Sequence, residues 1–138
     1  MRTTTRMATV AGVSALIVGG MSVPQASADG STCQSVYVSN PGPVAGTGCF
    51  VGHGDKITVD DRAADGMRVV VDWKTVNGRT GECHNAMGAG NFTVICDYNL
   101  PESDRISFRV CTRNGENGAN HRCTFWSAWI SVSTGDYS

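Results

Sequence analysis

The sequence predicts an all-β fold, a small antiparallel β-sandwich of six to seven strands held by three disulfides. Segments rich in β-branched and aromatic residues recur every ten to twenty residues, and a turn signal follows each of them. No segment shows a convincing helical period of apolar residues. Six cysteines and 17 glycines in 138 residues are typical of a small domain in which disulfides supplement a modest core.

The first 28 residues are predicted to be an export signal that is cleaved. Arg2 and Arg6 give a positively charged start, residues 7–23 are mostly apolar, and Pro24 ends any helix. Ala26 and Ala28 supply the small side chains that a signal peptidase accepts. Residues 29–138 are then expected to be a single secreted β-sandwich domain in an extracellular, oxidising setting, with no membrane contact after cleavage.

The charge of the mature chain argues against a polyanionic partner. Without Arg2 and Arg6, nine of the 11 Lys and Arg residues remain against 12 Asp and Glu residues, so the net charge is near −3. Because nucleic-acid binding depends on a cationic surface, we expect no nucleic acid as a partner. No motif indicates a cofactor or a metal ion, and we expect none.

Strands are expected at 34–39, 55–60, 67–76, 92–98, 105–112 and 125–133, with a possible short strand at 49–52. Alternation predicts which side chains face the core. The inward rows are Val36 and Val38; Ile57 and Val59; Val69, Val71 and Trp73; Ile106, Phe108 and Val110; and Trp126, Ala128, Ile130 and Val132. Val70, on the polar row of its strand, implies partial cover of that face. Short antiparallel strands of this number favour a sandwich of immunoglobulin-like shape.

The six cysteines allow fifteen pairings, which sequence alone cannot decide rigorously. Neighbouring cysteines bracket stretches rich in Gly, Pro and Asn, where the chain can reverse. No Cys-x-x-Cys motif is present to suggest zinc binding or thiol exchange. Nearest-neighbour pairing is therefore the most economical prediction: Cys33 with Cys49, Cys83 with Cys96, and Cys111 with Cys123.

The candidate binding residues are apolar side chains that are expected to point outward, with cover by a long loop or a neighbouring strand as the alternative. If Trp126 faces inward, then Phe125 and Trp129 point to the opposite face, and Tyr37 is likewise opposed to Val36. Outward aromatic side chains on a rigid sheet can stack on sugar rings or anchor a protein partner. Met87, in the loop between two cysteines, is the side chain that a protease pocket would accept if the chain were an inhibitor.

Residue types suited to hydrolysis are present without a recognisable motif. A small ribonuclease uses a base, an acid and a cation, and the chain has candidates for each in Glu82, His84, His121, Arg79 and Arg122. Their spacing does not predict that these side chains come together in one site. No Gly-x-Ser-x-Gly motif is present for a serine hydrolase. We name no catalytic residue and expect no enzyme, with a small secreted hydrolase or a protease inhibitor as alternatives.

Five segments resemble a group of small secreted streptomycete proteins, which are mostly uncharacterised: 64–66, 69–73, 78–83, 96–100 and 108–111. The resemblance covers most of the mature chain and implies an exported β-domain with disulfides. It brings no catalytic residues. The chain is also similar, more weakly, to the small adaptor subunit of umbrella toxin particles, which joins a lectin-bearing subunit to a large toxin-bearing one.

These observations together predict a secreted, non-enzymatic binding module that engages another secreted or cell-surface protein. An adaptor subunit of a secreted antibacterial toxin particle is one alternative. A carbohydrate-binding module, with a polysaccharide as ligand, is another.

Overall fold

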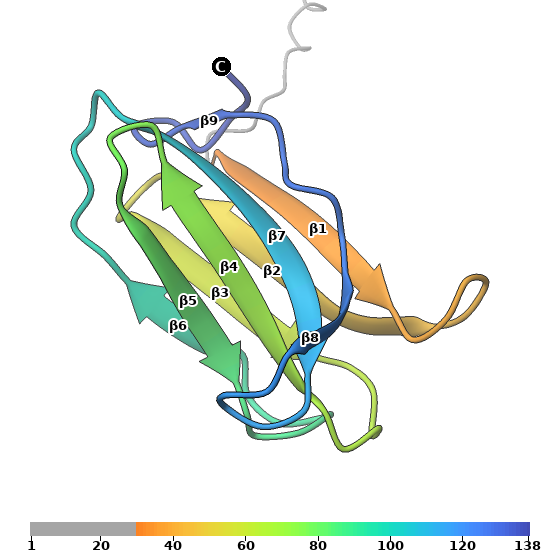
Figure 1. Ribbon diagram of the computed structural model, residues 1–138. Coiled ribbons are helices and arrows are strands. Elements are labelled where there is room, and N and C mark those ends of the chain that lie inside the picture. The colour runs from red at the N-terminus through yellow and green to blue at the C-terminus, as the bar shows by residue number, and fades with distance from the viewer. Residues whose placement is uncertain (1–29) are drawn as a thin grey trace, which may run out of the picture.

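The computed structural model describes residues 30–138, so the predicted export signal lies outside the described residues. Within this range the chain forms nine β-strands and no helix, in two antiparallel sheets that lie face to face (Figure 1). The prediction of a small all-β sandwich is therefore confirmed. Residues 30–138 contain no helical segment with the length and hydropathy needed to traverse a bilayer.

The first sheet has four strands in the order β1-β2-β3-β6. Its strands are β1 (Ser31–Tyr37), β2 (Val44–Val51), β3 (Lys56–Asp61) and β6 (Val94–Asp97). Hairpin connections join β1 to β2 and β2 to β3. The chain then forms β4 and β5 in the second sheet before β6 pairs with β3 in the first. The edges of this sheet are therefore β1 and β6.

The second sheet has the order β5-β4-β7-β8, and β9 also pairs with β7. Its strands are β4 (Arg68–Thr75), β5 (Thr80–Asn85), β7 (Arg105–Arg113), β8 (Asn120–Cys123) and β9 (Ile130–Ser131). The predicted reversal at Asn77-Gly78 is the turn between β4 and β5, where Gly78 has a φ of 93°. At the far edge, β8 and β9 both lie along β7, separated by residues 124–129.

The core lies between the two sheets and consists mainly of the side chains that alternation assigns to it. The buried residues that confirm this assignment are Val36, Ile57, Val59, Val69, Val71, Trp73, Ile106, Phe108, Val110, Ile130 and Val132. Phe50 of β2 completes the centre, and Trp73 packs edge-on against Tyr98 with ring centroids 4.8 Å apart. The predicted cover over Val70 is also confirmed, because this side chain is fully buried.

Two glycines on the inner face of β2 let the sheets approach closely. A Cβ atom at Gly48 would lie 2.4 Å from Cγ2 of Val71, and one at Gly46 would lie 2.4 Å from Cγ2 of Val69. Because glycine is uncommon in strand interiors, local pattern predicts only a short strand at 49–52 where the structure has all of β2. The requirement for glycine comes from the opposite sheet.

All three disulfides follow the predicted pairing. Cys33–Cys49 joins directly opposed residues of β1 and β2, and Cys111–Cys123 does the same for β7 and β8. The third bond differs, because Cys83 lies on β5 and Cys96 on β6. It links the two sheets along one side of the sandwich.

Two strands of the second sheet carry little sequence signal. In β5, the residue Gly81 lies beneath the indole of Trp73, where a Cβ would approach the ring to 2.4 Å. The rest of β5 is largely polar, because it is an edge strand with one face in solvent. The four polar or cysteine residues of β8 also lack β-branched side chains. The structure therefore has more strands than the six to seven predicted.

The prediction of a continuous strand at 125–133 is wrong, because only β9 is a strand there. Trp126 and Ala128, expected to face the core, are exposed. Val38 is also exposed, because β1 ends at Tyr37 and Val38 begins the turn into β2. Alternation holds only while regular pairing continues, and in both places the pairing has stopped.

Candidate functional site

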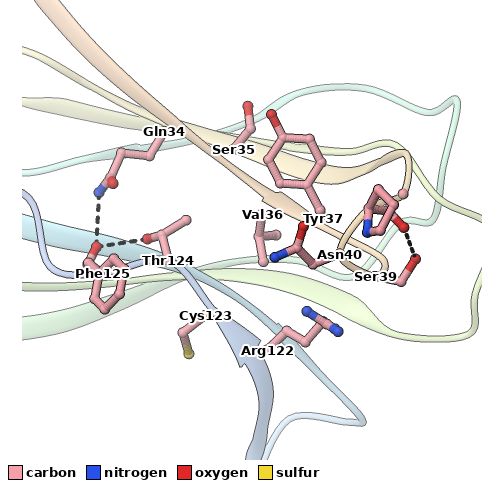
Figure 2. Close-up of a pocket in the computed structure, with 12 residues that line it drawn as sticks. Gln34, Ser35, Val36, Tyr37, Ser39, Asn40, Arg122, Cys123, Thr124 and Phe125 are labelled. Carbon is pink, nitrogen blue, oxygen red and sulfur yellow. Dashed lines mark hydrogen bonds between the residues drawn. The ribbon is translucent and has the colours of Figure 1, made fainter.

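A groove of about 650 Å³ runs along the side of the sandwich where the edge strands β1 and β8 lie next to each other (Figure 2). Residues of β1 and of the following turn form one wall, and residues 122–125 form the other. The lining residues are Gln34, Ser35, Val36, Tyr37, Ser39, Asn40, Pro41, Gly42, Arg122, Cys123, Thr124 and Phe125. The opposite side of the sandwich is linked by the Cys83–Cys96 disulfide, so the groove marks the side that no disulfide joins.

Gln34 connects the two walls at one point of the groove. Its Nε2 atom donates to the carbonyl oxygen of Phe108, at 2.9 Å, and to that of Phe125, at 3.4 Å (Figure 2). Gln34 has the same strand parity as Val36, so the sequence places a polar side chain on the inward row. Because a half-buried amide needs hydrogen-bond partners, a polar residue on the inward row indicates that β1 lies at the edge of its sheet. Sequence reasoning missed this signal.

Two hydroxyl side chains determine the path of the second wall. The backbone amides of Val110 and Phe108 on β7 donate to Oγ1 of Thr124 and to Oγ of Ser127, at 3.0 and 3.1 Å. In return, the amides of Thr124 and Ser127 donate to the carbonyl oxygens of the same two β7 residues. Hydroxyl oxygens thus replace backbone carbonyls as acceptors, so the segment follows β7 without forming a regular strand.

Tyr37 and Phe125, two of the predicted binding residues, lie on opposite walls of this groove. The Phe125 side chain is 93% exposed and Tyr37 is 48% exposed. Phe125 points outward as predicted and is not covered, but strand alternation is not the reason, because residues 124–129 form no regular strand. An aromatic ring so fully in water contributes little to folding and is available to a partner.

Arg122 gives the groove its charge. It is the single ionic side chain among the twelve lining residues, and it is exposed. Within residues 30–138, no carboxylate lies within 4 Å of it to form an ion pair. The remaining polar groups of the lining are neutral hydroxyls and amides, so the groove is cationic at one point and otherwise uncharged.

The other two predicted binding residues lie elsewhere. Trp129 is partly exposed beyond the groove, where its carbonyl oxygen accepts from the amide of Ser138. Met87 is exposed in the β5–β6 loop, beside a second hollow formed by turns at one end of the sandwich. The structure therefore joins Tyr37 and Phe125 in one groove but not Trp129 or Met87.

Trp126 lies against cations on the outer face of the second sheet. Nζ of Lys74 and the guanidinium carbon of Arg109 are 4.4 and 4.9 Å from its ring centroid. Arg109 is itself held by Asp72, with Nε donating to Oδ2 at 3.1 Å. Because strand alternation assigns Trp126 to the core, sequence reasoning missed this platform, in which the indole is 38% exposed.

The acid and base expected of a small hydrolase come together only in part. His84 Nε2 lies 2.9 Å from Oε1 of Glu82, but both carboxylate oxygens of Glu82 also accept from Arg113, at 3.1 and 2.8 Å. Hydrogen bonding to Arg113 lowers the pKa of Glu82 to about 2. A carboxylate with that pKa accepts protons poorly near neutral pH. His121 lies apart from this pair, on β8.

Among residues 30–138, no three His, Cys, Asp or Glu side chains are grouped in a way that could hold a metal ion.

Comparisons with protein-family models, with curated proteins and with solved structures found no match to this chain.

Proposed function

We propose that this chain is a secreted, non-enzymatic binding module that engages a protein partner outside the cell through the groove between β1 and β8. The observation that carries the proposal is the pairing of Tyr37 and Phe125 on opposite walls of one groove. Interfaces between proteins are enriched in exposed aromatic and arginine side chains, and this groove has both. The predicted export signal and the three disulfides support an extracellular location.

The disulfide Cys33–Cys49 supports the same proposal energetically. It fixes β1, one wall of the groove, to β2, so little conformational freedom remains to be lost when a partner binds. The second wall is fixed by Thr124 and Ser127 through their bonds to β7. A groove with two rigid walls is suited to recognition.

The test is capture from native culture supernatant followed by mass spectrometry. The wild-type chain and a Tyr37→Ala/Phe125→Ala variant serve as baits, and Phe92→Ala, whose ring is also exposed but lies outside the groove, is the matched control. We expect a protein retained by the wild type and by Phe92→Ala but not by the double variant. Two proteins retained together would indicate an adaptor role. A bait that retains nothing, or a partner indifferent to the double variant, contradicts the proposal.

A carbohydrate ligand is a second candidate, which the Trp126 platform favours. Its indole is held over Lys74 and Arg109, and Trp129 follows on the same segment. Partly exposed indoles can stack on sugar rings. This candidate predicts that insoluble chitin or cellulose depletes the protein and that Trp126→Ala with Trp129→Ala abolishes depletion. The absence of retention across a polysaccharide panel would remove it.

A further inference from the structure

The free edge of β1 offers unpaired backbone groups along the groove. Cys33 and Cys49 are directly opposed with their Cα atoms 4.0 Å apart. Directly opposed residues are about 4.5 Å apart when they share no hydrogen bonds and about 5.5 Å apart when they do. The N–H and C=O groups of Cys33, and of Ser35 two residues on, therefore point away from β2. The amide of Gly52 donates to the carbonyl oxygen of Gly30, which has the opposite parity, as this pattern requires.

Within residues 30–138, no hydrogen bond pairs the backbone of Cys33 or Ser35 with a second strand on this side. Ser35 lines the groove itself. The groove is therefore bounded on one side by the outward N–H and C=O groups of Ser35, and those of Cys33 continue the same strand edge two residues away.

β1 carries little of the protection that is usual for an edge strand, because its one irregularity, a register shift between Val36 and Tyr37, comes after Ser35. Edge strands are commonly short or carry charged residues or proline, which prevent pairing with another chain. β1 has seven residues, Ser31–Tyr37, and none of them is charged or proline. The other edges differ, because β5 carries Glu82 and His84, while β6 and β8 have four residues each and include Asp97 and Arg122.

We propose that the partner of this groove is an extended peptide segment carrying an acidic side chain, which adds to β1 as a further strand of the first sheet. This inference rests on the proposed function and specifies its binding mode. Backbone hydrogen bonds to Cys33 and Ser35 supply affinity, as in other cases of strand addition. Arg122, unpaired on the opposite wall, selects the acidic side chain, and Tyr37 and Phe125 contact apolar side chains at either side.

The first experiment selects random peptides of about ten residues, displayed on phage, against the folded wild-type protein. Selected peptides are then synthesised, and each backbone nitrogen is methylated in turn. We expect enriched peptides to contain Asp or Glu. Methylation at alternate positions should weaken binding about tenfold or more, because each such position loses one ladder hydrogen bond. Binding should also slow hydrogen exchange at the Cys33 and Ser35 amides.

The second experiment changes the edge itself. Ser35→Pro removes an outward N–H without removing a β1–β2 hydrogen bond, and proline is tolerated at such edge positions. Ser35→Ala is the matched control, since it loses only the hydroxyl contact with Thr47. We expect Ser35→Pro to weaken peptide binding about tenfold and Ser35→Ala to leave it nearly unchanged. Arg122→Gln should weaken the acidic peptides, whereas Arg105→Gln, an exposed arginine outside the groove, should not.

Three results would overturn strand addition. The first is a peptide that tolerates methylation at every backbone nitrogen, and the second is a peptide that binds Ser35→Pro as tightly as Ser35→Ala. The third is a dimer in analytical ultracentrifugation that Ser35→Pro dissociates, because the edge would then pair with a second copy of this chain. Should Ser35→Pro fail to fold, the methylated peptides still decide, because they leave the protein unchanged. A native partner that requires Tyr37 and Phe125 but ignores Ser35→Pro would leave the proposed function standing and refute this binding mode alone.

Discussion

Replacing Glu82 with Gln and Arg113 with Met, singly and together, should reveal a coupling energy of about 1 kcal/mol at neutral pH that is lost in acid. The two side chains meet on the outer face of the second sheet, where Arg113 Nη2 lies 2.8 Å from Oε2 of Glu82. The Arg113 side chain is largely buried, and its guanidinium also bonds Asn120. A double-mutant cycle isolates the term that belongs to the pair.

The magnitude follows from the acidity of Glu82. Its carboxyl pKa falls from the ordinary 4.5 to about 2, chiefly because it accepts hydrogen bonds from Arg113. At about 1.4 kcal/mol for each tenfold change in acidity, this corresponds to about 3 kcal/mol in total. The Glu82 side chain is 44% exposed, so solvent screening reduces the stabilisation to about 1 kcal/mol.

The sign of the pH dependence is fixed by the direction of the shift. Because the folded-state pKa of Glu82 is lowered, its carboxylate contributes stability that is fully present above pH 4.5 and is lost as the pH falls towards 2. The assay is urea unfolding followed by circular dichroism, with the disulfides intact, for the wild type and three variants. The coupling energy should be constant at neutral pH and should decline between pH 4.5 and 2.

Asp60 and Arg62 provide the matched control pair, because their charged atoms are 3.7 Å apart and both side chains are more exposed to solvent than that of Arg113. Their cycle should give a coupling energy near zero at every pH. The reasoning is refuted if the Glu82–Arg113 coupling is no larger than that of the control pair, or if it is the same at pH 2 as at neutral pH.

Three further outcomes are expected. Gly48→Ala should lower the free energy of unfolding by about 1–3 kcal/mol in urea titrations, since its Cβ would meet Val71 across the core. Replacing Cys83 and Cys96 together by Ala should cost about 3 kcal/mol, visible as a lower melting temperature, because the loop that they close spans 13 residues. Burial raises the pKa of Asp61, so its charged form is disfavoured in the folded state. Asp61→Asn should therefore leave the free energy of unfolding unchanged or raise it at neutral pH. A lower midpoint of urea unfolding for this variant would contradict the prediction.

The elements that the sequence predicts well are those whose side chains alternate regularly. In β7, Phe108 and Val110 are buried as strand parity requires, and the disulfides pair as neighbours because each loop between cysteines reverses the chain. Local pattern is a sufficient guide there because packing and pairing impose the same period.

Elements shaped by the opposite sheet are not predictable in this way. Gly48 weakens the strand signal of β2 and is required because Val71 and Val110 approach it from the opposite sheet. At residues 124–129, Thr124 and Ser127 interrupt alternation by bonding β7 through their hydroxyls. The parity argument that placed Trp126 in the core therefore fails.

Two residues of the candidate site could be predicted from the sequence, but the groove that joins them could not. Tyr37 and Phe125 could be identified as outward-pointing aromatic residues, but they are 88 positions apart. Tyr37 lies on β1 of the first sheet, and Phe125 lies in the irregular segment that runs along β7 of the second sheet. Their meeting across one groove depends on how the layers stack, which no local pattern encodes. The free edge of β1 is likewise a property of the sheet order.

The hydrogen bonds made by the Thr124 and Ser127 hydroxyls also have a consequence for the side chains around them, because these bonds hold the segment in place without help from its neighbours. Both residues anchor the chain to β7 through their own side chains and backbone. The other four residues of this segment contribute little to the core, since all of them are exposed: Phe125, Trp126, Ala128 and Trp129. Residues 124–129 thus form a scaffolded strip on which side chains can be exchanged while the two anchors stay fixed. Substitutions at the exposed positions of this strip are therefore expected to change the chemistry of the surface without disturbing the packing of the sandwich.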